Sequence, residues 1–182
     1  ANLDRLQIHK LLENPWHEVR MLAAFILCLQ FSRSTSQSER ERLVKFYMSH
    51  LSAFNNWDLI DATAYKILGS YLVETQGPAR LMKLAKSKEM WTQRLAIVAS
   101  LSFIKSGHTH VIYDLAPMFY TSKHDLIHKA LGWMLREAGK VNQTELKKFL
   151  EQKSGLLPRT SLRYAIEKLS IEERAYYLKR KS

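Results

Sequence analysis

The sequence has few of the residues that mark several common classes of protein. It contains a single cysteine, Cys28, which excludes an internal disulfide and fits a reducing compartment. No stretch approaches the roughly 20 consecutive apolar residues of a membrane span, and no signal-peptide pattern opens the chain. We therefore expect a cytoplasmic protein that does not enter a membrane.

Glycine is also scarce. The 6 glycines never form the Gly-x-x-x-x-Gly-Lys or Gly-x-Gly-x-x-Gly patterns that bind phosphates and dinucleotides, so we expect no nucleotide cofactor. His124 and His128 are four residues apart, but no cysteine or convincing carboxylate set accompanies them, and we expect no metal site. Cys28 lies in an apolar run without an identifiable histidine partner. It is therefore predicted to be a core thiol and not a nucleophile.

Acidic residues are fewer than basic residues in this chain. The chain has 28 Lys and Arg against 17 Asp and Glu, which gives a net charge of +11 over 182 residues. The excess is uneven, because residues 129–182 hold 13 Lys and Arg against 6 Asp and Glu and so carry +7 of the total. Charge of this sign favours a polyanionic partner, of which nucleic acid is the commonest.

No alternating strand pattern and no hairpin signal interrupts the helical periodicity of the chain. The sequence therefore predicts an all-α protein, and its length fits a single domain over 1–182. The expected breaks are Asn14-Pro15, Ser32 to Ser38, Asn55-Asn56, Gly77-Pro78, Gly107, Gly139 and Gly155. The expected helices are 3–13, 15–31, 37–51, 57–75, 78–86, 90–105, 109–120, 124–138, 143–153, 158–168 and 171–180.

The expected helices fall into pairs with a recurring interval. Trp16, Trp57 and Trp91 each begin the second helix of a pair, 41 and then 34 residues apart, and Asp125 and Thr160 continue the series at 34 and 35 residues. Two-helix repeats of this length stack into a solenoid in which one helix of each pair lines a concave surface. Together with the charge, this interval predicts a solenoid with a basic concave groove.

The stretch 55–61 holds the most unusual combination of side chains. Trp57 and Asp61 are four residues apart, so on a helix both leave the same face, one turn apart. A carboxylate beside an apolar packing stripe needs a partner, water or a function. Asp58 would point about 100° away from Trp57 around the helix, and its negative charge would instead favour the helix N-terminus.

Aromatic and charged residues recur on the later second helices. Trp91 precedes Arg94, and Trp133 precedes Arg136. Core packing explains any single tryptophan. Several electron-rich rings around a carboxylate, however, attract a cation, and in a basic protein such a site suits a cationic ligand carried on a polyanion.

Three segments in this order, 56–61, 91–97 and 128–137, resemble the DNA alkylation repair glycosylases of the AlkD type. The resemblance covers about residues 14 to 168. It implies HEAT-like repeats, and release of N3- or N7-alkylated purines from duplex DNA without extrusion of the damaged base into a pocket. Family members usually have further N-terminal helices, so the resemblance also implies that this chain is short by one or two.

The resemblance assigns roles to individual residues. Asp61 would be the catalytic carboxylate, and Trp57 and Trp133 the aromatic walls against the lesion's deoxyribose and backbone. Arg94 would contact the nearby phosphate, Trp91 is assigned to the core, and Arg136 stays open between a phosphate contact and a structural ion pair. The expected DNA-binding residues are Arg94, Lys129, Arg136, Lys140, Arg159, Arg163 and Lys168.

Two alternatives stay open. A structure-specific DNA-binding protein of the same fold would lack the activity, and a protein-interaction scaffold would use the groove for an acidic partner. The scaffold has no need of an isolated Asp61 between aromatic rings. We expect a monomer whose partner is double-stranded DNA carrying alkylated bases, associated with the bacterial nucleoid while bound.

Overall fold

The computed structural model describes residues 3–75 and 77–180, and this part of the chain consists of helices and their connections without strands. The all-α prediction is confirmed. The α-helices are α1 (Arg5–Leu12), α2 (His17–Arg33), α3 (Gln37–Ser49), α4 (Trp57–Thr63), α5 (Ser70–Glu74), α6 (Ala79–Ala85), α7 (Met90–Lys105), α8 (His110–Leu115), α9 (Asp125–Val141), α10 (Gln143–Lys153), α11 (Arg159–Ala165) and α12 (Ile171–Lys179). A π-helical segment, η2 (Tyr65–Gly69), joins α4 to α5, and short 3-10 turns are η1 (Leu51–Ala53), η3 (Ala116–Phe119) and η4 (Ser154–Leu156).

Most of the expected breaks lie where helices end, with one clear exception. Gly77 and Gly107 adopt φ angles of 63° and 86°, the left-handed region that favours glycine after a helix. The break expected at Gly139 is wrong, because α9 continues through it to Val141. Glycine costs a helix interior only about 1 kcal/mol. The space it leaves is taken by Leu146 of α10, which a Cβ at position 139 would meet.

The helix expected over 57–75 is continuous in direction but not in hydrogen bonding. After α4, the amide of Gly69 donates to the carbonyl of Ala64, five residues earlier, which is the bond of a π-helix. The carbonyl of Tyr65 accepts the Ser70 amide within the helix, and it also accepts bonds from Ser70 Oγ at 3.1 Å and from Ser102 Oγ of α7 at 2.6 Å. The wider turn is therefore held in place by a neighbouring helix.

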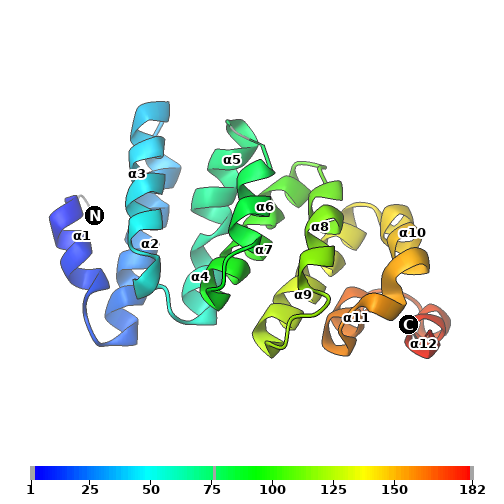
Figure 1. The fold of residues 1–182 in the computed structure, drawn as a ribbon. Coiled ribbons are helices and arrows are strands. Elements are labelled where there is room, and N and C mark those ends of the chain that lie inside the picture. Colours follow the sequence, from blue (N-terminus) through cyan, green and yellow to red (C-terminus); the bar gives the residue numbers. More distant parts are fainter. Residues whose placement is uncertain (1–2, 76, 181–182) are drawn as a thin grey trace.

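The helices follow one another in an elongated row from α1 at one end to α12 at the other (Figure 1). The second helices contact each other in sequence, α2 with α4, α4 with α7, α7 with α9, and α9 with α11. The helices α6, α8 and α10 pack against this series from the other layer. We call the surface formed by α2, α4 with η2, α7, α9 and α11 the second-helix face. A solenoid of HEAT-like repeats stays our interpretation of this arrangement.

Polar contacts between successive pairs recur at a few separations in the sequence, and those of His9 with His50 and of His17 with Asp58 span 41 residues. The contacts of Cys28 with Ala62, Asp61 with Arg94, and His128 with Ser161 span 34, 33 and 33 residues. Those of Tyr65 with Ser102 and Thr109 with Glu145 span 37 and 36. These separations fit the predicted interval between second helices, since equivalent positions in stacked pairs lie side by side.

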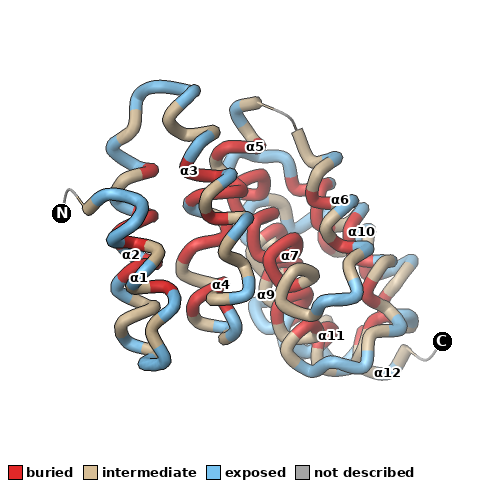
Figure 2. Tube along the Cα trace, turned by 60° about the vertical axis from the view of Figure 1, so that its left-hand side comes forward, coloured by how far each residue is buried: buried red, intermediate tan, exposed pale blue. Residues whose placement is uncertain are grey.

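The core runs along the row and is deepest at α7. Every residue of α7 from Arg94 to Ile104 is buried, and Figure 2 shows this helix enclosed by its neighbours. A helix that is apolar on nearly all sides needs covering on all sides. Because the buried middle of α7 is packed on all sides, the positions of its two ends on the second-helix face are set by this packing.

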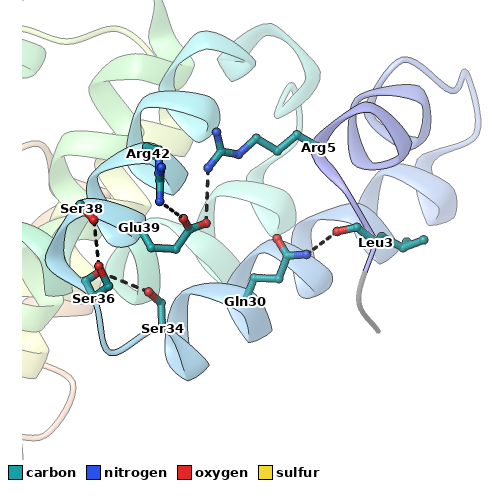
Figure 3. A network of polar contacts seen from close by, with 8 residues as sticks. All are labelled: Leu3, Arg5, Gln30, Ser34, Ser36, Ser38, Glu39 and Arg42. Atoms are coloured by element: carbon teal, nitrogen blue, oxygen red, sulfur yellow. Dashed lines mark hydrogen bonds and ion pairs between the residues drawn. The ribbon is translucent and has the colours of Figure 1, made fainter.

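A polar network fixes the first three helices to one another (Figure 3). Glu39 of α3 accepts bonds from Arg5 of α1 and from Arg42, at 3.3 and 2.7 Å. Gln30 of α2 donates to the carbonyl of Leu3 at 2.7 Å. In the connection after α2, the hydroxyls of Ser36 and Ser38 are 2.8 Å apart, so the serine-rich break is an ordered turn.

None of the helices in the described part of the chain combines the length and the apolar character that crossing a membrane requires.

Candidate active site

The first wall of the site is the beginning of α4. The side chain of Asn56 accepts a bond from the Trp57 amide at 2.8 Å and so caps the helix. Trp57, in the first turn, is 51% exposed. Asp58 turns away: its carboxylate accepts the Leu59 amide and lies 2.8 Å from His17 Nε2 of α2. The helical spacing predicted this divergence, and it leaves Asp61 as the carboxylate on the side of Trp57.

Asp61 is held by an arginine that reaches across from α7. Arg94 donates from Nε to Asp61 Oδ1 at 2.9 Å and from a terminal nitrogen to Oδ2 at 2.7 Å, a two-pronged ion pair. The other terminal nitrogen donates to the carbonyl of Leu126 in α9. The side chains are 5% exposed for Arg94 and 16% for Asp61. Arg94 therefore lies deeper than the carboxylate, which is the more exposed of the two.

This position changes what can be expected of Arg94. The family resemblance assigns it to a DNA phosphate, but its side chain is buried and three of its five N–H groups are donated to Asp61 and Leu126. The side chain is only 5% exposed, so little of the guanidinium is accessible to a phosphate. The ion pair joins Arg94 to Asp61, and the phosphate contact of Arg94 stays a prediction.

The second wall is formed by α9. Trp133 is half-buried and packs against the core, while Lys129 lies one turn earlier. Lys129 is paired with Asp125 at 2.7 Å on the same helix. Arg136 forms ion pairs with Glu137 at 3.5 Å and with Glu167, which favours the structural part of the alternative left open for it.

Tyr164 of α11 completes the site, and the sequence reasoning missed it. It faces α9 because Gly132 allows a close approach: a Cβ at position 132 would be 2.6 Å from the Tyr164 Cβ and from the carbonyl oxygen of Ser161. Ser161 also donates to the carbonyl of His128 at 2.8 Å. No motif marks Tyr164 in the sequence. Its only signal is a place on a predicted second helix.

These side chains enclose an open cleft of about 470 Å³, which we call the Asp61 cleft. Its lining residues are Trp57, Asp61, Arg94, Leu126, Lys129, Trp133, Arg136 and Tyr164. Three aromatic side chains, one carboxylate and the cations Lys129 and Arg136 thus line the same cleft. Of the predicted catalytic residues, all three line the cleft.

Burial dominates the electrostatics of the carboxylate. Desolvation raises the pKa of Asp61 above the ordinary value for aspartate, although its bonds with Arg94 oppose the shift. The bond with Asp125 raises the pKa of Lys129 further above its ordinary value, at which lysine is already a cation at neutral pH. The cleft thus combines a partly desolvated carboxylate with aromatic side chains and the ammonium of Lys129.

Four of the expected DNA-binding residues lie outside the cleft. Lys140 pairs with Glu137 at 2.7 Å, and Lys168 with Glu167 at 3.2 Å. Arg159 donates to the carbonyl of Leu178 at 3.0 Å, and Arg163 is exposed on α11. Trp91, which was assigned to the core, is partly buried against it.

Cys28 and His128, two residues weighed above for other chemistry, have local structural surroundings. Cys28 is buried, and desolvation raises its pKa to about 11, so the thiol is the protonated form at neutral pH. His128, which forms the four-residue pair with His124, bonds through Nε2 to the carbonyl of Ser122 at 2.6 Å. Among the residues that the structure describes, no group of three or more His, Cys, Asp and Glu side chains is arranged to hold a metal ion.

Comparisons with known proteins give the family of the chain and agree with its fold. A family model described as DNA alkylation repair enzyme matches residues 2–169. The chain therefore belongs to the DNA alkylation repair enzyme family. A solved structure described as "Predicted DNA alkylation repair enzyme from Enterococcus faecalis" is 18% identical, and the alignment covers 91% of this chain and 75% of that one with a TM-score of 0.73. At this identity the likeness shows the fold. No curated protein sequence matches the chain.

Proposed function

We propose that the protein is a DNA glycosylase that removes cationic N3- or N7-alkylated purines from duplex DNA by hydrolysis of the N-glycosidic bond, without flipping the base. The observation that carries the proposal is the Asp61 carboxylate, fixed by buried Arg94 and flanked by Trp57 and Trp133. Membership of a DNA alkylation repair family and the net charge of +11 support DNA as the partner.

The residue types suit this reaction. An N3- or N7-alkylated purine already carries a positive charge, so it can leave without the general acid that glycosidases use. The electrons of the breaking bond pass to the purine nitrogen, and positive charge develops on the sugar. Asp61 stabilises that charge, and the faces of Trp57 and Trp133 attract it by roughly 0.5 to 2 kcal/mol each.

Water completes the reaction. Its oxygen bonds to C1′ of the sugar, while a proton passes to Asp61 or to solvent, which leaves a neutral alkylpurine and an abasic site. Each oxygen of Asp61 accepts one bond from Arg94, and a carboxylate oxygen has a further lone pair to orient the water. In this proposal Arg94 holds the carboxylate in place.

Phosphate contacts supply the binding. Lys129 and Arg136 line the cleft, and Lys140, Arg159, Arg163 and Lys168 lie on the same C-terminal part of the chain. Contacts of this kind release counterions, so affinity should fall steeply with salt and depend little on base sequence. We further propose that the protein acts as a monomer in the cytoplasm, on the nucleoid while it is bound to DNA.

One observation favours a second candidate function. Both oxygens of Asp61 are paired with Arg94, an arrangement that also serves as a structural ion pair. A non-catalytic protein that binds damaged or branched DNA would need nothing more. A protein-interaction scaffold is the weaker alternative, because it leaves the three aromatic side chains of the Asp61 cleft without a function.

The experiment is the release of 7-methylguanine from methylated duplex DNA by the wild-type protein, by Asp61→Asn and by Asp114→Asn. Asp114 is an exposed aspartate of α8, away from the cleft, and serves as the matched control. Asn leaves the buried Arg94 charge without its partner, so Asp61→Asn is assayed at temperatures where it is folded. There we expect it to be slower by about 10²- to 10³-fold with DNA binding intact, and Asp114→Asn to equal the wild type. Equal excision by all three proteins would refute the role of Asp61. No excision by any of them, with salt-sensitive DNA binding, would establish the non-catalytic alternative.

A further inference from the structure

Two histidines meet at the N-terminal end of the row of helices, outside the Asp61 cleft (Figure 1). His9 lies in the last turn of α1, and His50 directly follows α3. Nδ1 of His9 and Nε2 of His50 are 3.0 Å apart, and the planes of the two rings are inclined at 68°. Neither the family assignment nor the proposed activity gives this pair a function.

The hydrogen bonds around His50 fix which of its ring nitrogens carries the proton. Nδ1 lies 2.8 Å from the carbonyl oxygen of Phe46, which can only accept. Nδ1 also lies 3.1 Å from Ser49 Oγ, which donates its own proton to the same carbonyl at 2.9 Å. Both neighbours therefore accept from Nδ1. In neutral His50 the lone pair is consequently on Nε2, the nitrogen that faces His9.

A carboxylate orients the other ring in the same sense. Glu13, one turn after His9, places Oε1 at 3.2 Å from His9 Nε2. Because a carboxylate only accepts, it favours a proton on Nε2 and leaves the lone pair of neutral His9 on Nδ1, so that two lone pairs meet. If the proton moved to Nδ1, the lone pair of Nε2 would face the carboxylate instead. Two neutral rings thus keep one repulsive contact in either arrangement, and a positive charge between them removes it.

A metal ion is such a charge, and both rings have the surroundings of histidine ligands in metal sites. Histidines that bind a metal donate their other ring N–H to a carboxylate or to a backbone carbonyl, which orients the ring. His9 has Glu13 in this position, and His50 has the carbonyl of Phe46. The ring of His50 also packs against that of Phe46, with 4.1 Å between the ring centres. Each imidazole is therefore held with one ring nitrogen free to bind an ion.

The distance between the two nitrogens indicates the class of ion. Bonds from a metal to imidazole are about 2.0–2.1 Å long, so nitrogens 3.0 Å apart subtend an angle of about 94° at a shared ion. This angle is close to the right angle between neighbouring ligands of a tetragonal ion and smaller than the tetrahedral angle of about 109°. Nitrogen ligands in tetragonal geometry are typical of Ni²⁺ and Cu²⁺.

The pair lines an open cleft of about 490 Å³, which leaves room for further ligands. The side chain of His9 is 38% exposed, so an ion can reach it from solvent. The cleft also holds the opposite charges of Glu13 and Arg20, which offset each other, and Arg20 donates to the carbonyls of Asn14 and Pro15. Two imidazoles are fewer than the three or four protein ligands of zinc sites, so water fills the remaining positions.

We propose that His9 and His50 bind a divalent transition-metal ion of the nickel and copper class, with water as the remaining ligands and Glu13 as the residue that orients His9. The ion joins α1 to the end of α3, and so adds to the ion pair of Arg5 with Glu39 between the same two helices. This inference does not depend on the proposed glycosylase activity.

The test is calorimetric titration of the untagged protein with Ni²⁺, and with Mg²⁺, which prefers oxygen ligands and should not bind. The variant His9→Gln/His50→Gln is compared with the matched control His108→Gln/His110→Gln. His108 and His110 are both exposed, their ring centres are 6.0 Å apart, and no hydrogen bond joins them in the part of the chain that the structure describes. Circular dichroism of each variant checks that it is folded.

We expect one Ni²⁺ per chain for the wild type and for the control. Loss of an orienting partner alone weakens metal binding by about 10- to 100-fold, so Glu13→Ala, which keeps both ligands, should bind about tenfold more weakly. The His9/His50 variant should lose at least about a hundredfold. Ni²⁺ should also raise the melting temperature of the wild type and leave that of the His9/His50 variant unchanged, because a ligand of the folded state stabilises it.

Three results would overturn the proposal. Absence of Ni²⁺ binding by the wild type would leave a shared proton as the charge between the two rings. Equal affinity, or an equal loss of affinity, in the His9/His50 variant and the His108/His110 control would place the ion elsewhere on the chain. Unchanged affinity in Glu13→Ala would contradict the orientation of His9 on which the site depends.

Discussion

Arg94 and Asp61, 33 residues apart in the sequence, form a two-pronged ion pair at 2.9 and 2.7 Å between α7 and α4. The arginine is buried and the carboxylate reaches the Asp61 cleft. The pair joins two successive second helices and fixes the orientation of the carboxylate that we propose for catalysis.

Removal of the arginine should affect both stability and activity. Breaking a buried ion pair from one side typically costs 3–5 kcal/mol, because the remaining charge has no partner. We expect Arg94→Gln to lower the free energy of unfolding by about that amount and to reduce base release even at temperatures where the variant is folded. Urea denaturation and excision assays measure the two effects.

The conservative variant separates position from charge. Lysine retains the charge but has no two-pronged geometry. We therefore expect Arg94→Lys to recover much of the stability and little of the activity. Full activity in Arg94→Lys would contradict the positioning role.

The pH profile of base release should report the carboxylate. Burial raises the pKa of Asp61, and the proposed chemistry needs the ionised form. Activity should therefore fall as the pH is lowered through a value above the ordinary pKa of aspartate, and recover at higher pH. Subtraction of the rate measured with Asp61→Asn removes spontaneous acid depurination. An acid limb at the ordinary aspartate value would contradict the raised pKa.

Trp57 can be tested with little effect on the fold, since its side chain is 51% exposed. Loss of one aromatic face from a developing cation costs roughly 0.5 to 2 kcal/mol, so Trp57→Ala should slow base release by about 2- to 30-fold. Its thermal stability should change little. Trp16, which is 70% exposed before α2, provides the matched control, and Trp16→Ala should keep wild-type excision. Equal rates for both variants would remove Trp57 from the site.

Two glycines of α9 should respond differently to the same substitution. A Cβ at Gly132 would meet the backbone oxygen of Ser161, which cannot move freely, whereas at Gly139 it would meet the end of the Leu146 side chain. We expect Gly132→Ala to destabilise the protein by about 1–3 kcal/mol and to displace Tyr164 from the cleft. Gly139→Ala should be nearly neutral, since the gain in helix propensity of about 1 kcal/mol offsets the adjustment. Thermal unfolding measures the stability of the two variants. Equal losses of stability would contradict the close approach of α9 and α11.

Sequence periodicity predicted the helices well because helix formation depends on contacts within a few residues. The expected helix 90–105 agrees with α7, and 143–153 with α10. The error at Gly139 arose because a glycine can end a helix or allow a neighbour to approach, and only the position of Leu146 distinguishes the two. The π-helical turn at Tyr65 is likewise stabilised from α7, by Ser102.

The sequence by itself determined the helical class of this protein, its basic charge, and the pairing of Trp57 with Asp61 on one helical face, because these properties are local or compositional. Only the tertiary structure decided that Arg94 pairs with Asp61, that Tyr164 completes the cleft, and that His9 and His50 meet. These relationships join residues from different helices. They depend on how closely the helices pack, which a local pattern in the sequence does not specify.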